Sequence, residues 1–158
     1  MGELRIVDEA VVAAPAAAVW SAIADPAEHA RWHPFVTRIT GEHRLGATRS
    51  CRVDLGRRKG ETRERCISAE PERRIAWQID EDSTGFLRLV TDWTAGFHLE
   101  SQGSDWTRVV AESAFSPRTL LVRPVLPLVR RRFHATQRAI LAALEDAVGE
   151  KGRARIDA

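Results

Sequence analysis

Residues 92–99 read Asp-Trp-Thr-Ala-Gly-Phe-His-Leu and alternate strictly between two sets of side chains. A two-residue period of this kind is typical of a β-strand with one buried face. The face expected in the core carries Trp93, Ala95, Phe97 and Leu99. A turn at 102–105 follows, and pairing across it can bring a second series onto the same face: Val109, Ala111, Ser113 and Phe115. We adopt this register; the alternative, a slip by one residue, would invert the second strand. The sequence therefore predicts an antiparallel hairpin that is buried on one side.

Short alternating runs separated by turn residues continue on both sides of this hairpin. We predict strands at 4–12, 35–40, 47–55, 61–69, 74–80, 86–101 and 107–116. Every connection after residue 35 within this region is hairpin-sized, which favours an antiparallel meander over a parallel sheet.

Two short helices are predicted between the first and second strands. Pro15 stands at a favourable first position for a helix over 16–24, and Asp25-Pro26 ends that helix. A second helix is expected over 27–31, ahead of Pro34.

A long amphipathic helix is predicted near the C-terminus. From Leu126 to Val148, apolar side chains recur at spacings of three, four or seven residues, and Gly149 is expected to end the helix. A curved antiparallel sheet of about seven strands wrapped around this helix is the simplest α+β arrangement that buries it, and such a fold encloses a cavity. We expect one domain over 1–149 and a charged tail over 150–158.

Composition excludes several classes of protein. The chain has 158 residues, of which 44% are apolar and 29% charged, as expected for one soluble globular domain. Its 24 basic and 22 acidic side chains leave a net charge of +2, which gives no indication of nucleic-acid binding. We find no signal peptide, no membrane-spanning run and no nucleotide or phosphate loop, so we expect a cytoplasmic protein without a cofactor.

The two cysteines flank the turn at 56–60. On a hairpin, Cys51 and Cys66 would face each other within about one residue of register, which allows a cross-strand disulfide. Two reduced, half-buried cysteines are the favoured interpretation.

Several short motifs, taken in order, resemble the START and polyketide cyclase/dehydratase superfamily. These are helix-grip proteins that share the fold of the major birch pollen allergen. The matching segments cover Val11–Pro15, Val19-Trp20, Ala24-Asp25, Trp32–Pro34, Ser68–Trp77 and Asp105–Val109. The resemblance implies a hydrophobic pocket between the sheet and the C-terminal helix. Members of this superfamily bind lipids, sterols, plant hormones, polyketides or quinones, and a minority cyclise or dehydrate polyketides.

Aromatic side chains are the best material for the walls of such a pocket. The predicted ligand-binding residues are Trp32, Phe35, Trp77, Phe86, Trp93, Phe97, Phe115, Phe133, Gln137 and Ile140. The same aromatic residues would also fill a solid core, and Gln137 could instead face solvent.

Two residues are candidates for acid–base chemistry of the cyclase type. His33 and Glu64 are the residues to test first, the latter because its strand is expected to pass the pocket. Although His29 and His33 stand four residues apart, Ala30 and Arg31 lie between them and Pro34 follows, so no metal site is predicted.

Between Ser113 and Leu144 the chain carries six arginines and no acidic residue. The apolar neighbours of three of these arginines allow contact with an anionic membrane or an acidic partner through Arg130, Arg131 and Arg132. The alternative is that the arginines form a solvated helix face without a partner. Three functions therefore stay open: a carrier of a hydrophobic small molecule, a polyketide cyclase/dehydratase-like enzyme on an aromatic precursor, and an interaction protein that uses the basic helix. An unpaired edge of the sheet would also allow a homodimer.

Overall fold

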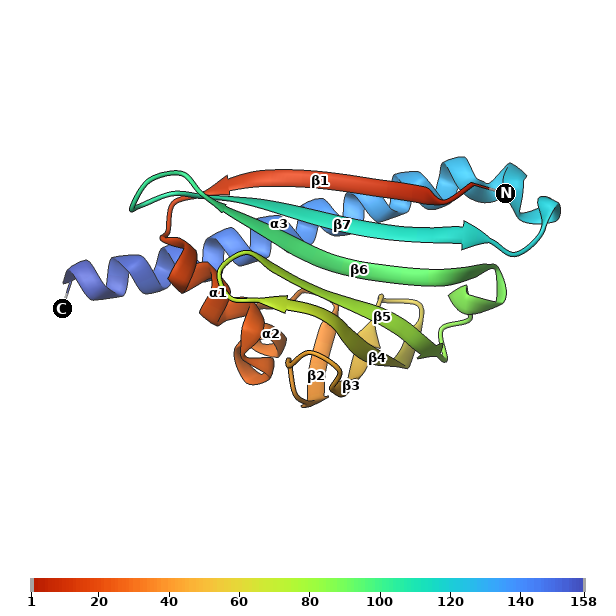
Figure 1. Cartoon of the computed structure of the whole chain (residues 1–158), viewed down its shortest axis with the longest axis horizontal. Helices are drawn as coiled ribbons and strands as arrows, with labels where there is room; N and C mark the ends of the chain where they lie inside the picture. The colour runs from red at the N-terminus through yellow and green to blue at the C-terminus, as the bar shows by residue number, and fades with distance from the viewer. Residues whose placement is uncertain (1, 158) are drawn as a thin grey trace.

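The computed structural model describes residues 2–157 and consists of a seven-stranded antiparallel sheet with a long helix across one face (Figure 1). The elements in chain order are β1 (Leu4–Val12), α1 (Ala16–Ala24), α2 (Pro26–Trp32), β2 (Val36–Gly41), β3 (Thr48–Asp54), β4 (Lys59–Glu70), β5 (Arg74–Asp82), η1 (Phe86–Arg88), β6 (Val90–Ser101), β7 (Thr107–Pro117), η2 (Leu120–Val125) and α3 (Leu126–Asp157). The order in the sheet is β1-β7-β6-β5-β4-β3-β2, so β1 and β2 are its edges. The predicted α+β fold is confirmed.

The register of the β6–β7 hairpin is the one predicted from the alternation. Ala95 pairs with Ser113, Phe97 with Ala111 and Leu99 with Val109. These pairs lie on the inner face of the sheet, the face that α3 covers, and Trp77 of β5 continues the Ala95–Ser113 row.

One buried carboxylate joins the sheet to α3. Asp8, on the inner face of β1, is 9% exposed and accepts hydrogen bonds at Oδ2 from His134 Nδ1 and Gln137 Nε2, both at 2.8 Å. Arg138 Nε donates to Oδ1 at 3.2 Å. The Gln137 amide oxygen accepts a further bond from Ser113 Oγ of β7 at 2.8 Å. Consecutive turns of α3 are therefore fixed to β1 and β7.

The strand predicted from residue 86 is wrong over its first four residues, where a short 3-10 helix, η1, lies instead. The side chain of Asp82 explains the difference. Its two carboxylate oxygens accept bonds from the backbone N–H groups of Thr84, Phe86 and Leu87, at 2.8, 2.8 and 3.3 Å. These bonds fold the chain into a turn that the apolar pattern alone does not reveal.

The expected end of the long helix at Gly149 is also wrong, because α3 continues to Asp157. A glycine inside a helix is unfavourable relative to alanine but does not remove a backbone hydrogen bond as proline does. Pro124 lies in η2, and Pro127 lies in the first turn of α3, where its missing N–H costs no helical hydrogen bond.

The cysteines are free and fully buried rather than half-buried. The predicted cross-strand register is wrong: Cys51 pairs with Thr62, which places Cys66 four residues further along β4. Four residues of strand span about 13 Å, far beyond the Cα separation that a disulfide allows.

Because α3 continues through Gly149, replacing this glycine by alanine should stabilise the protein. At Gly149 a Cβ atom would meet no heavy atom within 4 Å, so Gly149→Ala is expected to raise the free energy of unfolding by about 0.5–1 kcal/mol. Urea unfolding measures the change. A decrease in stability would instead indicate a left-handed glycine that ends the helix.

The contacts of Asp8 predict a large effect of its removal. Asp8→Ala leaves Gln137 and His134 without their acceptor and is expected to lower the free energy of unfolding by about 2–4 kcal/mol. The matched control is Glu9→Ala, which removes an exposed carboxylate on the next residue that pairs with Arg108. Equal losses for both variants in urea unfolding would contradict the role given to Asp8.

Candidate functional site

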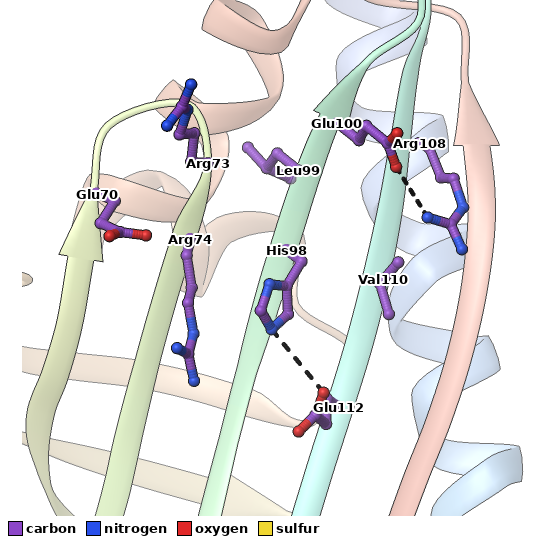
Figure 2. Close-up of a pocket in the computed structure, with 9 residues that line it drawn as sticks. All are labelled: Glu70, Arg73, Arg74, His98, Leu99, Glu100, Arg108, Val110 and Glu112. Atoms are coloured by element: carbon purple, nitrogen blue, oxygen red, sulfur yellow. Dashed lines mark hydrogen bonds and ion pairs between the residues drawn. The ribbon is translucent and has the colours of Figure 1, made fainter.

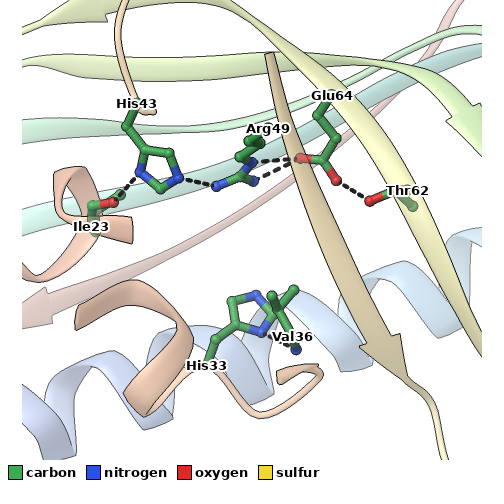
Figure 3. A network of polar contacts seen from close by, with 7 residues as sticks. All are labelled: Ile23, His33, Val36, His43, Arg49, Thr62 and Glu64. Carbon is green, nitrogen blue, oxygen red and sulfur yellow. Dashed lines mark hydrogen bonds and ion pairs between the residues drawn. The ribbon is translucent and has the colours of Figure 1, made fainter. Parts of the chain in front are cut away.

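A buried ion pair lies on the inner face of the sheet between β3 and β4 (Figure 3). Arg49 Nε and Nη2 both donate to Glu64 Oε1, at 3.0 and 2.7 Å, and Thr62 Oγ1 donates to Glu64 Oε2 at 2.6 Å. The two charged side chains are only 6% and 11% exposed. Because Arg49 and Glu64 are direct cross-strand neighbours, the register of the β3–β4 hairpin fixes the pair.

The guanidinium of Arg49 also contacts Trp77 and His43. It lies over the Trp77 ring of β5, with its central carbon 3.7 Å from the ring centroid, in a cation–π contact. Its Nη1 donates to His43 Nε2 at 2.7 Å. All three guanidinium nitrogens therefore have partners, which offsets the cost of burying the charge.

His43, from the β2–β3 connection, links this network to α1. Its Nδ1 donates to the carbonyl oxygen of Ile23 at 3.0 Å, while Nε2 accepts from Arg49. This arrangement requires the neutral ring with the proton on Nδ1. Burial first, and then the positive charge of Arg49, lower the pKa of His43 to about 4.

His33, just after α2, has a fixed orientation below the network (Figure 3). Its Nδ1 accepts from the backbone N–H groups of Phe35 and Val36, at 3.1 and 3.0 Å, so the neutral ring carries its proton on Nε2. Nε2 forms no hydrogen bond to any residue in the described part of the chain. Burial, followed by the charge of Arg49, lowers the pKa of His33 to about 3.

His29, inside α2, completes a group of three neighbouring imidazoles. Its ring stacks on Trp32 at 5.1 Å and lies 5.2 Å from the ring of His33 and 5.6 Å from that of His43. Burial is the main cause that holds the pKa of His29 well below its usual value. Its Nδ1 is buried without a partner.

Two indole N–H groups on the inner face are also buried without a hydrogen-bond acceptor: Trp77 Nε1 and Trp93 Nε1. A buried donor without an acceptor costs about 1–3 kcal/mol, so such groups commonly mark a bound water or ligand. The two indoles come from neighbouring strands, β5 and β6; Trp77 belongs to the large apolar cluster but also contacts Arg49 and His43, whereas Trp93 packs against the small apolar cluster. An oxygen atom of a bound molecule would satisfy either one.

The predicted ligand-binding residues divide between two apolar clusters. The large cluster, around Val12, Ile23 and Leu144, contains Trp77 and Phe97 and has Trp32 and Ile140 packed against it. The small cluster, around Ile6 and Val90, contains Phe115 and has Phe86, Trp93 and Phe133 packed against it. Phe35 belongs to neither and packs edge-on against the His33 ring at 6.2 Å.

Gln137 is buried rather than solvent-exposed, and its amide is occupied by Asp8, Ser113 and the Ile6 carbonyl. Its assignment to ligand binding stays a prediction, as do those of the aromatic residues.

The two residues predicted for acid–base chemistry lie in this region, but they are held differently from a general base. Glu64 has both oxygens bonded to Arg49 and Thr62, and the low pKa of His33 makes it a weak base at neutral pH. Sequence reasoning missed Arg49 and His43. The alternation in β3 carried the signal for Arg49, because it shares its face with the buried Cys51.

The outer face of the sheet holds an open, charged depression of about 670 Å³ (Figure 2). It is lined by residues that alternate with the buried ones on β6 and β7, including His98, Glu100, Arg108 and Glu112. Glu100 and Arg108 pair at 2.9 Å, and His98 lies 3.8 Å from Glu112. No group of three or more His, Cys, Asp or Glu side chains among the described residues is placed to hold a metal ion. Among the helices of residues 2–157, none is long and apolar enough to span a membrane.

A curved antiparallel sheet that grips a long C-terminal helix defines the helix-grip class of proteins. The chain belongs to the family described as polyketide cyclase/dehydrase and lipid transport, whose model matches residues 3–149. A search of curated proteins found no match.

Solved structures with this fold include proteins of different functions. The aromatase/cyclase ZhuI from Streptomyces sp. R1128 superposes with a TM-score of 0.78 at 20% identity, covering 98% of each chain. A START superfamily protein from Mycobacterium smegmatis gives 0.77 at 18% identity, covering 94% of this chain and 99% of that one. Norcoclaurine synthase from Thalictrum flavum, a point mutant in complex with a transition-state analogue, gives 0.74 at 21% identity, with 96% and 97% covered. At these identities the likeness establishes the fold alone.

The lowered pKa values predict how stability depends on pH. Below the ordinary histidine pKa of 6.5, the unfolded chain takes up protons that His33 and His43 do not accept in the folded protein until their pKa values of about 3 and about 4. The free energy of unfolding should therefore fall as the pH drops from 6.5 towards 4. In urea unfolding at several pH values, His43→Gln should reduce this slope by about one proton. An unchanged slope would contradict the neutral, Arg49-bound state of His43.

Proposed function

We propose that the chain binds a hydrophobic small molecule between the inner face of the sheet and α3, as a carrier or binding protein. The observation that supports the proposal most directly is the pair of buried, unpartnered indole donors, Trp77 Nε1 and Trp93 Nε1. Walls of aromatic and aliphatic side chains with a few fixed polar groups are typical of small-molecule sites. Membership of a family that includes lipid transport is consistent with this function.

The charges around the site favour a ligand that is uncharged overall. Glu64 neutralises Arg49, and the low pKa values keep His33 and His43 uncharged at neutral pH. A free anion would compete with Glu64 for a guanidinium whose nitrogens are already bonded. Carbonyl or hydroxyl oxygens, in contrast, would accept hydrogen bonds from the indoles at no cost in net charge.

The same features make binding a better proposal than cyclisation. A cyclase or dehydratase-like enzyme needs a group that exchanges protons near neutral pH, and neither Glu64 nor His33 is held for that task. Two free, buried cysteines are typical of a reducing compartment, so we expect the protein to act in the cytoplasm.

The test is native mass spectrometry of the freshly purified protein, with the released molecule identified from a denatured extract. We expect a stoichiometric apolar adduct that carries at least one oxygen acceptor. Trp77→Phe and Trp93→Phe keep an aromatic six-membered ring but remove the indole N–H donor, and each should weaken binding of the identified molecule by about tenfold.

The matched control is Trp106→Phe, which changes an indole that is 49% exposed and outside both clusters, and which should leave affinity unchanged. The proposal fails if the protein carries no adduct and also binds nothing from a lipid extract of its expression host. It also fails if neither inner-face variant changes the affinity.

A further inference from the structure

Large apolar side chains are exposed together at one end of the molecule. In η2, Leu121 is 89% and Leu120 is 63% exposed, and Leu128 in the first turn of α3 is 54% exposed. Val125 at the end of η2 and Leu89 after η1 add to the same region. So many exposed large apolar side chains in one short segment are unusual for a soluble domain unless the segment binds something.

The two short 3-10 helices are tied together and form one surface. Arg118 donates from its backbone N–H to the Leu89 carbonyl at 2.9 Å and from Nε to the Leu87 carbonyl at 2.7 Å. Figure 1 shows both connections, β5–β6 and β7–α3, at the end of the sheet where the N-terminus lies. We call the surface formed by Leu89 and residues 118–132 the docking end.

The docking end is positively charged and lacks compensating carboxylates. It carries Arg118, Arg123, Arg130, Arg131 and Arg132, and no Asp or Glu occurs between residues 113 and 144. None of these five arginines forms an ion pair with a residue in the described part of the chain. Some arginines on the sheet do pair with a glutamate, as Arg5, Arg63 and Arg108 do; what distinguishes the docking end is that its five arginines stand beside exposed leucines in a segment without any acidic residue.

We propose that the docking end binds the surface of an anionic lipid membrane. Leu120 and Leu121 would enter the boundary between headgroups and acyl chains, while the arginines bind lipid phosphates. A second copy of this chain is a poor occupant, because it would bring the same unpaired positive charge against this surface. Exposed leucines together with unpaired arginines match a negatively charged apolar interface.

Docking in this way would bring the small cluster next to the membrane. The inward side of the same segment, Leu126, Val129 and Phe133, packs with Phe86 and Trp93. An apolar molecule could then pass between the bilayer and the inner face of the sheet without crossing bulk water. This route rests on the proposed function, whereas docking itself requires no ligand.

The test is cosedimentation of the full chain with vesicles of phosphatidylcholine alone or with one-third phosphatidylglycerol, without added ligand. We expect binding to the anionic vesicles only, weakened by added salt. The triple variant Arg130→Ala/Arg131→Ala/Arg132→Ala should lower the partition coefficient on the order of 100-fold, since each surface arginine contributes about fivefold. Leu120→Asp/Leu121→Asp should abolish binding.

Two controls match these variants. Leu45→Asp/Leu55→Asp changes two exposed leucines, at 66% and 47%, in the β2–β3 and β3–β4 connections, and Arg57→Ala/Arg73→Ala/Arg74→Ala removes the same charge elsewhere. Both should bind as the wild type does. Absence of wild-type binding, equal binding to both vesicles, or equal loss in variants and controls would overturn the proposal. None of these results bears on the adduct found by mass spectrometry, so the two proposals fail separately.

Discussion

The attachment of α3 to β1 through Asp8 determines which part of the inner face of the sheet the helix covers. A helix fixed to Asp8 by His134, Gln137 and Arg138 is held against the β1–β7 side of the sheet. The inner face of β3 and β4 is then free to carry the polar groups that surround Arg49. Asp8 can fix α3 because its carboxylate is buried together with all its partners. An apolar contact alone would fix neither the rotation nor the register of the helix.

In the polar site, as at Asp8, the buried charge is surrounded by the groups that neutralise it and accept its hydrogen bonds. Arg49 is tolerable in the interior because Glu64, His43 and the Trp77 ring together satisfy its charge and its hydrogen-bond donors. Its charge in turn helps to keep His33 and His43 neutral. The groups left without partners include the indole N–H groups of Trp77 and Trp93 and Nδ1 of His29, all of them on uncharged side chains, which suits the neutral ligand proposed above.

The sequence predicted the structure best where a two-residue alternation of apolar side chains decides which face of a strand is buried. Alternation in β6 and β7 predicted correctly that Phe97 and Ala111 share the buried face, whereas a slip by one residue would have turned the apolar side chains of β7 outward. It was least informative where a side chain overrides the period, as Asp82 does when it folds residues 84–87 into a turn. Of the polar site, Glu64 and His33 could be named from the sequence, but not their partner Arg49. An arginine in a strand is ordinarily assigned to solvent, and only the β3–β4 register shows that Glu64 lies opposite.

The arginines of this chain are used in two opposite ways, and the contrast bears on function. Several arginines on the sheet pair with acidic side chains, as Arg108 does with Glu9 and Glu100, so their charges cancel locally and contribute little beyond solubility. At the docking end the chain offers them no carboxylate over more than thirty residues and sets them beside exposed leucines. If this segment were only a solvated helix face, its arginines would be explained but not the exposed Leu120 and Leu121. If it faced the core, the leucines would be explained but not the arginines. An apolar, negatively charged surface would use both, which is why we propose an anionic membrane as the partner of this end of the molecule.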